Sequence, residues 1–161
     1  MTTTTSSQEN LPVLPTLPTD EVRQIMWRFA DRGDLRQLVR ATRGVARELV
    51  ARLVADGQRD THHWTPEKQR LLDALDEAGV TSIFADREYG GSIEGPKNLA
   101  TALAAFELAW VDGGAATCLI ALGLAVQPIL ALGSPDQKSA YLKSANGRGH
   151  PPLHPSTASR T

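Results

Sequence analysis

Two features of this 161-residue sequence are candidates for metal binding or for a nucleophile: a pair of adjacent histidines and a single cysteine. His62 and His63 are adjacent, but neighbouring residues do not share a helix face, and no Cys or carboxylate pair lies nearby at ligand spacing. Cys118 is the one cysteine, and its apolar surroundings predict a small buried hydrophobe. We therefore expect no metal site. Because a lone cysteine cannot form an internal disulfide, we expect a reducing compartment, the cytoplasm.

Arginines recur through the first third of the chain, where they would suit an anionic partner. They are Arg28, Arg32, Arg36, Arg40, Arg43 and Arg47, and their spacing places most of them on one side of a helix. A nucleic-acid site needs a basic surface without compensating acids. Here the formal net charge is -1, and acids are interspersed at Asp31, Asp34, Glu48 and Asp56. The pattern predicts a solvated, ion-paired face and no nucleic-acid partner.

The stretch AATCLIALGLAVQPILAL, residues 115–132, has one strongly polar side chain and no charge. It has the chemistry of a membrane span, a core helix or the wall of a cavity for an apolar ligand. Gly123, Gln127 and Pro128 interrupt it, Asp112 precedes it, and no Lys or Arg lies close by to anchor it, so we expect no membrane span. A helix that is apolar all round is normally surrounded by protein, and this chain has few elements to surround it. We expect this stretch to be the most exposed part of the chain when it is alone.

Composition indicates which elements must position these residues. Apolar residues make up 41%, charged residues 22% and aromatic residues 5%, which is typical of one globular domain with a core of Leu, Val and Ala. Such a core favours packed helices. We predict an all-α bundle of about six helices over residues 19–146. It follows a disordered Pro/Thr-rich lead, residues 1–18, that contains Pro12, Pro15 and Pro18, and it precedes a disordered tail, residues 147–161. The N-terminus has no basic or apolar segment typical of a signal peptide.

Capping residues and apolar spacing predict where the helices lie. The first begins at Thr19 or Asp20. The second runs from about Leu35 to Gly57 with Asp34 as a plausible cap. The others cover about 65–79, 96–110 and the apolar stretch, and a last one begins with Ser134 as cap, Pro135 at its first position and Gln137 completing a capping box. Residues 80–85 are predicted to be a short extended segment, and Gly90 and Gly91 to allow a positive φ and a close backbone approach.

An ordered series of motifs resembles the N-terminal helical domain of the acyl-CoA dehydrogenases. A Leu-rich helix ends at Gly79, and an extended stretch leads to the turn Glu88-Tyr89-Gly90-Gly91. A helix then ends in Glu107-Leu108-Ala109 before Asp112, and the apolar helix leads to LGSPDQKSAYL. The resemblance runs from about Trp64 to Arg148, while the helices before Trp64 fit the family only loosely.

The resemblance implies an FAD-dependent enzyme of fatty acid metabolism. Such an enzyme removes an α-proton from an acyl-CoA thioester while the β-hydride passes to the flavin, and it usually forms dimers or tetramers. By position in the family pattern, Ile120, Ala121 and Leu124 would face the acyl chain, with the small Ala121 leaving room for it. Ordinary core packing remains an equally good explanation for each of the three.

The sequence departs from the family where catalysis would be expected. No residue matches the family's catalytic base, because Glu67, Glu88, Glu94 and Glu107 are interpreted as surface, turn or helix acids. The segment from Asn146 onward does not resemble the start of the flavin-binding β domain, which suggests a truncated or frameshifted copy. We therefore expect no dehydrogenase activity from the chain alone. The alternatives are a stand-alone helical interaction module or one half of a split enzyme.

Overall fold

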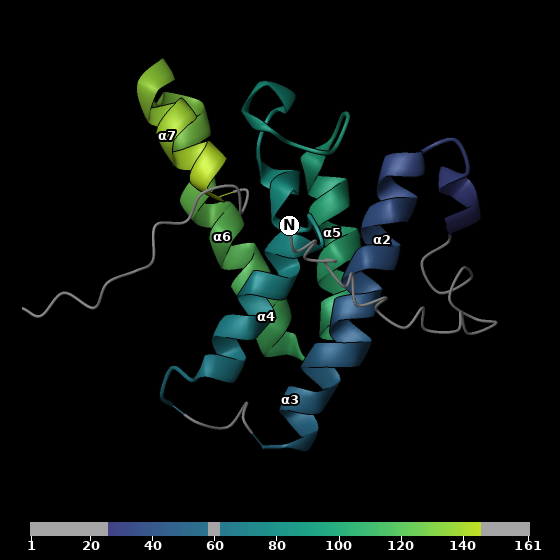
Figure 1. Ribbon diagram of the computed structural model, residues 1–161. Coiled ribbons are helices and arrows are strands. Elements are labelled where there is room, and N and C mark those ends of the chain that lie inside the picture. Colours follow the sequence, from purple (N-terminus) through teal and green to yellow (C-terminus); the bar gives the residue numbers. More distant parts are fainter. Residues whose placement is uncertain (1–25, 58–61, 146–161) are drawn as a thin grey trace, which may run out of the picture.

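The computed structural model describes residues 26–57 and 62–145, and these residues form helices and turns without a strand (Figure 1). The elements in chain order are η1 (Met26–Phe29), α2 (Gly33–Val45), η2 (Ala46–Val50), α3 (Ala51–Ala55), α4 (Pro66–Glu77), η4 (Thr81–Phe84), η5 (Arg87–Tyr89), α5 (Lys97–Ala109), α6 (Gly113–Leu132) and α7 (Pro135–Ala145). The predicted all-α class is confirmed. Residues 1–18 and 147–161, predicted to be disordered, lie outside the described residues.

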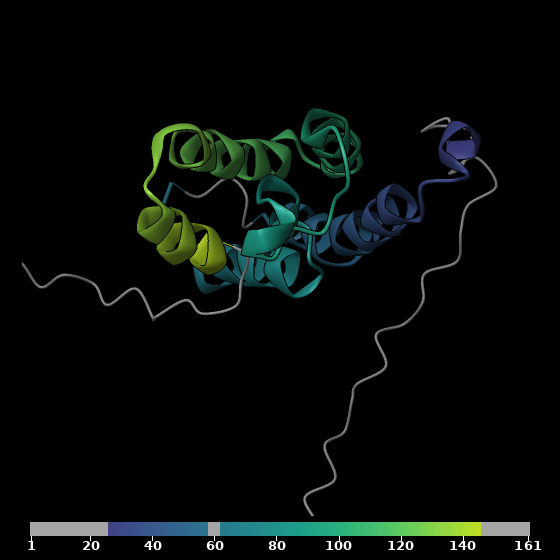
Figure 2. The same ribbon diagram turned by 90° about the horizontal axis from the view of Figure 1, so that it is seen from above.

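The helices form two layers with a short turn between them. Viewed from above, α5 and α6 lie in one layer and α2 and α4 in the other, while α7 folds back beside α6 (Figure 2). The 3₁₀ turn η4 lies between the layers and contacts α4, α5 and α6. The largest fully buried apolar side chains come from nearly every element and form one core: Leu35, Val39, Val50, Leu75, Val80, Ile83, Leu108, Leu119 and Leu142.

The predicted long helix before Gly57 is confirmed as one continuous run, in which α2 passes through the π-helical turn η2 into α3. Its start differs from the prediction. Asp34 lies inside the first turn and binds Arg32, and no side chain caps the helix. Of the predicted first helix, only Met26–Phe29 falls among the described residues, and it is a 3₁₀ turn.

Two other predicted helix starts, those of α4 and α7, are confirmed by their hydrogen bonds. The Thr65 hydroxyl accepts from the Lys68 amide at the start of α4, with Pro66 in the first turn. At the start of α7, Ser134 and Gln137 form the predicted reciprocal capping box, with hydrogen bonds of 2.9 and 3.2 Å. Asp112 caps α6 by accepting from the Ala115 amide at 2.8 Å, which fixes where the apolar helix begins.

The segment predicted to be extended, residues 80–85, is instead the 3₁₀ turn η4. Its apolar side chains explain the difference. Val80, Ile83 and Phe84 lie three and four residues apart, so a helical turn buries all three together, whereas a strand would direct Ile83 and Phe84 to opposite faces. The two glycines after it behave as predicted. Gly90 has a φ of +91°, and a Cβ on Gly91 would lie 2.0 Å from the Ala85 carbonyl oxygen.

A buried ion pair joins the two layers. Arg43 on α2 donates two hydrogen bonds, each 3.0 Å long, to the two carboxylate oxygens of Glu107 on α5. The side chains are 8% and 1% exposed. The sequence placed Arg43 on a solvated face, and that prediction is wrong for this arginine. Arg28 and Arg40 do lie on the exposed side.

We predict that Glu107→Gln lowers the free energy of unfolding by about 3 to 5 kcal/mol, because Arg43 then stays buried without its counter-charge. Urea unfolding followed by circular dichroism measures the change. The matched control is Arg87→Gln, which breaks the exposed pair of Arg87 with Glu94 and is expected to cost less than about 1 kcal/mol. Equal losses for the two variants would contradict a structural role for the buried pair.

Candidate functional site

Helix α6 is buried along one side only. Its buried residues, Ala115, Ala116, Leu119, Gly123 and Val126, repeat at spacings of three and four and face the core. The opposite side, which we call the α6 face, consists of Gly113, Thr117, Cys118, Ile120, Ala121, Leu124, Ala125, Gln127, Pro128, Ala131 and Leu132. It carries no charge along a helix about 30 Å long. The stretch is predicted to be the most exposed part of the chain, and the structure shows it exposed along this side.

The helix also has the length and composition of a membrane span, with a mean hydropathy of 2.1, and only 28% of it is buried. Its buried side contributes to the domain core through Leu119 and Val126. Cys118 lies on the exposed side, so the expectation that it is buried is wrong. Ala121 and Leu122, one helical turn further on, are apolar as well. Because the helix is apolar all round, the sequence gives no signal of which side faces the core.

The three residues predicted to contact an acyl chain lie together on the α6 face. Ile120 is 43% exposed and Leu124 70% exposed, and Ala121 is exposed between them. Residues at positions i, i+1 and i+4 of a helix lie within about one turn of each other. Their exposure excludes core packing within the described residues, while their contact with an acyl chain stays a prediction.

Two features behind and within the α6 face were not anticipated from the sequence. A Cβ on Gly123 would lie 2.6 Å from the Phe84 ring, so the glycine lets α6 pack directly against η4. Pro128 lies inside the helix and has no amide hydrogen, so the Leu124 carbonyl lacks its usual helical partner. The Leu124 carbonyl thus adds a polar group to a mostly apolar helix side that also carries Gln127 and Thr117. A proline inside a long helix is the sequence signal for such a carbonyl.

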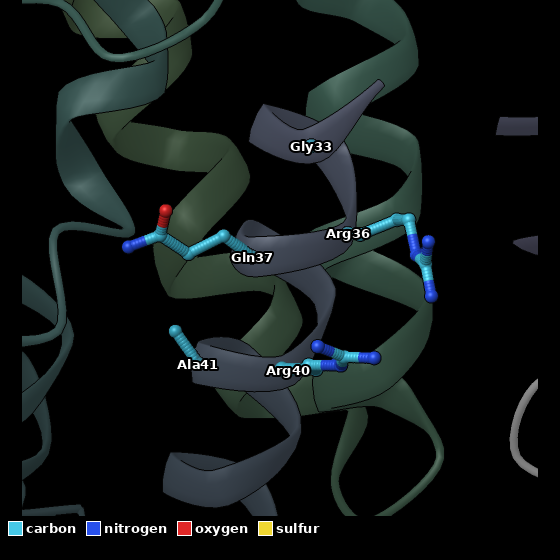
Figure 3. A pocket seen from close by; sticks show the side chains of 5 residues that line it. All are labelled: Gly33, Arg36, Gln37, Arg40 and Ala41. Atoms are coloured by element: carbon cyan, nitrogen blue, oxygen red, sulfur yellow. The ribbon is translucent and has the colours of Figure 1, made fainter. Parts of the chain in front are cut away.

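The described residues also form two polar hollows. One is shallow and lies on α2, where Arg36 and Arg40 point to one side of the helix and Gln37 and Ala41 to the other (Figure 3). The second, of about 600 Å³, lies between α2, the end of α4 and the turn after η5, and its lining includes Asp34, Asp76 and Glu77. Among residues 26–57 and 62–145, no group of three or more His, Cys, Asp or Glu side chains is arranged to hold a metal ion.

Asp34 at the edge of the second hollow connects two parts of the chain. Arg32 donates to both of its carboxylate oxygens, at 2.9 and 2.7 Å, and the Glu94 amide donates to it at 3.2 Å. Mainly because of the Arg32 hydrogen bonds, the pKa of Asp34 falls to about 2. In the turn nearby, lost hydration and the Glu88 carboxylate raise the pKa of Tyr89. Asp34 is thus a structural anion that holds the segment before α5 against α2.

The described residues form an all-α domain whose longest helix, α6, exposes an uncharged side. The model of the acyl-CoA dehydrogenase N-terminal domain matches residues 33–147, and the chain belongs to that family. The match begins at α2 and so includes helices that the sequence motifs fitted only loosely. No curated protein and no solved structure matches the chain.

Members of this family generally depend on a flavin, and neither of the two hollows described above fits FAD. The larger hollow is lined by three carboxylates, Asp34, Asp76 and Glu77, which would repel the pyrophosphate of the cofactor. The shallow hollow offers two guanidinium groups from a single stretch of α2 and no apolar slot for a ring system. We therefore derive no flavin step from residues 26–57 and 62–145.

We predict that the ion pair of Asp34 stabilises the fold above about pH 4 and is lost as the pH falls towards its folded pKa of about 2. The difference in unfolding free energy between the natural chain and Asp34→Asn should therefore shrink over this interval. Urea unfolding at a series of pH values measures it. Arg32→Met removes the main cause of the lowered pKa and leaves the backbone hydrogen bonds from Glu94 and Leu35, so in this background the effect of Asp34→Asn should depend less on pH. A difference that grows on acidification would contradict the assignment.

We further predict that purified chain mixed with FAD elutes without the cofactor in gel filtration, because its hollows are acidic or shallow. Absorbance of the protein peak in the visible range measures retention. Riboflavin, which lacks the pyrophosphate, serves as a control for the repulsion by carboxylates. Retention of FAD at one equivalent per chain would show that residues of this chain do form a flavin site.

Proposed function

We propose that this chain provides one wall of the acyl-chain pocket of an FAD-dependent acyl-CoA dehydrogenase. The observation that supports this is the uncharged α6 face, on which Ile120, Ala121 and Leu124 lie exposed and adjacent. In this proposal the acyl chain lies along these three side chains. The small Ala121 forms a recess between two larger residues, and the apolar surface excludes water from the substrate.

The hydrophobic effect favours binding of an acyl chain to such a surface. Each methylene group transferred from water to an apolar contact contributes about 0.8 kcal/mol when fully buried. A single helix covers only one side of the chain, so we expect weak binding by this chain alone and tighter binding once other walls are present. Oxidation of the bond between the α and β carbons belongs to the assembled enzyme in this proposal, and the part played by this chain is to bind and orient the substrate. We place that enzyme in the cytoplasm, as a dimer or tetramer.

A second candidate function is suggested by the same surface. An uncharged helix side about 30 Å long is also suited to contact another protein, such as the complementary half of a split enzyme. The two functions differ in what binds the isolated chain, because only the first predicts a response to the acyl group of a thioester.

Titration of isotopically labelled chain with octanoyl-CoA, below its micelle concentration, tests the proposal. We expect the methyl NMR signals of Ile120, Ala121 and Leu124 to shift with octanoyl-CoA and to remain unchanged with CoA, because CoA has no acyl chain. Leu124→Asp should abolish the shifts by placing a charge against the methylene groups.

The matched control is Leu132→Asp, which changes another exposed leucine of α6 about 12 Å further along the helix and should leave the shifts intact. Equal shifts with CoA and octanoyl-CoA would refute acyl-chain recognition by the α6 face. So would shifts that survive in Leu124→Asp and disappear in Leu132→Asp.

A further inference from the structure

The second half of α6 contains a carbonyl group that has lost its helical partner. In an α-helix each carbonyl accepts a hydrogen bond from the amide four residues later. For Leu124 that position is Pro128, and proline has no amide hydrogen to donate. The helix nevertheless continues to Leu132. The Leu124 carbonyl therefore keeps its capacity to accept a hydrogen bond from a donor outside the helix.

This carbonyl lies on the exposed side of α6. A carbonyl in an α-helix points along the axis towards the residues three and four positions later, which here are Gln127 and Pro128. Both of these residues are exposed, and Leu124 itself is 70% exposed. A ligand that lies on the α6 face can therefore reach the carbonyl oxygen.

The Gln127 side chain adds a second hydrogen-bonding group at the same place. Among residues 26–57 and 62–145 it has no hydrogen-bond partner. Its amide offers both donors and an acceptor. A hydroxyl group also donates and accepts, so a single hydroxyl can donate to the Leu124 carbonyl and accept from the Gln127 amide. We call the Leu124 carbonyl and the Gln127 side chain the polar pair of α6.

Thr117, which carries the hydroxyl of the α6 face, differs from the polar pair. Its hydroxyl already donates to the Gly113 carbonyl, at 2.9 Å. It also lies about 10 Å before Leu124 along the helix, at about 1.5 Å per residue. The first half of the α6 face thus uses its side-chain donor within the helix, whereas the second half presents hydrogen-bonding groups to whatever lies on it.

We propose that the polar pair binds a hydroxyl group at the far end of an acyl chain, so that the ligand of the α6 face is an ω-hydroxyacyl thioester. This inference rests on the function proposed above and specifies its substrate class. The acyl chain passes along Ile120, Ala121 and Leu124, with its thioester on the side of Ile120. Its terminal hydroxyl donates to the Leu124 carbonyl and accepts from the Gln127 amide.

The spacing of these groups suits an acyl chain of medium length. Ile120 and Gln127 lie about 10 Å apart along the helix, at about 1.5 Å per residue. An extended eight-carbon chain spans roughly 8 Å, because three successive bonds of an extended backbone advance by about 3.5 Å. The bond to the terminal oxygen adds to this length. A hydroxylated eight-carbon chain in contact with Ile120 therefore reaches the polar pair.

The polar pair gives a reason to prefer a hydroxyl over a methyl group at the end of the chain. A methyl group would displace water from the Leu124 carbonyl and the Gln127 amide without replacing the hydrogen bonds of that water. A hydroxyl restores them. From the net contribution of one hydrogen bond, we expect the hydroxylated chain to bind about threefold to tenfold more tightly.

Titration of the isotopically labelled full chain with 8-hydroxyoctanoyl-CoA and with octanoyl-CoA tests the proposal. We expect the hydroxylated ligand to bind about threefold to tenfold more tightly, and the side-chain amide NMR signals of Gln127 to shift with this ligand alone. Gln127→Leu removes the amide, and Pro128→Ala supplies an amide hydrogen for the Leu124 carbonyl. In each variant the ratio of the two affinities should fall towards one.

The matched control is Thr117→Val, which also removes a polar group from the α6 face and should leave the ratio unchanged. Equal affinities for the two ligands in the natural chain would overturn this inference and leave the proposed function standing. If neither ligand causes shifts that depend on its acyl chain, the proposed function fails as well. A Gln127 signal that shifts equally with CoA would assign the polar pair to the pantetheine part of the ligand. That result overturns the inference, as does a preference that survives in both Gln127→Leu and Pro128→Ala.

Discussion

Arg43 and Glu107 form the contact on which the arrangement of the two layers depends. Two parallel hydrogen bonds between a guanidinium and a carboxylate fix both the separation and the rotation of the side chains that make them. Because the pair is buried, a shift of α5 along α2 would leave two charges without partners in a medium that solvates them poorly. Apolar contacts between the same helices tolerate small displacements far better. The ion pair therefore sets the register of α5, and α6 follows it after a connection of three residues, Trp110 to Asp112.

A second polar contact fixes the other end of the same helix pair. Asp34 holds Arg32 and the Glu94 amide together, so the segment leading into α5 is attached at the start of α2. These two contacts join α2 and α5 at separate points along their length. Helix α6 packs against α5 and η4, and α7 packs against α6 and η5. The α6 face therefore belongs to a helix that takes part in neither of these two polar contacts.

Local rules predicted most helices of this chain, and tertiary contacts decided the points where they failed. The caps at Thr65 and Ser134 act within four residues, so the sequence alone reveals them. Arg43 looked like its solvated neighbours because its partner lies 64 residues away. The orientation of α6 was equally hidden, since a helix that is apolar all round has no periodic signal to distinguish Cys118 from Leu119. The family motifs selected Ile120, Ala121 and Leu124 as contacts of an acyl chain, which stays a prediction, and the structure adds that all three are exposed.

The contact between Gly123 and Phe84 has a consequence for the dimensions of any pocket that α6 helps to form. Because Gly123 has no side chain, the phenyl ring of Phe84 lies directly against the backbone of α6 at this point. The size of that ring therefore sets the distance between α6 and the rest of the core. Phe84 is itself buried and does not reach the α6 face. A larger or smaller residue at position 84 would move the helix outward or inward and carry Ile120 and Leu124 with it. In the proposed acyl-chain pocket, the width available to the ligand would then depend on a side chain that lies behind the helix, away from the α6 face.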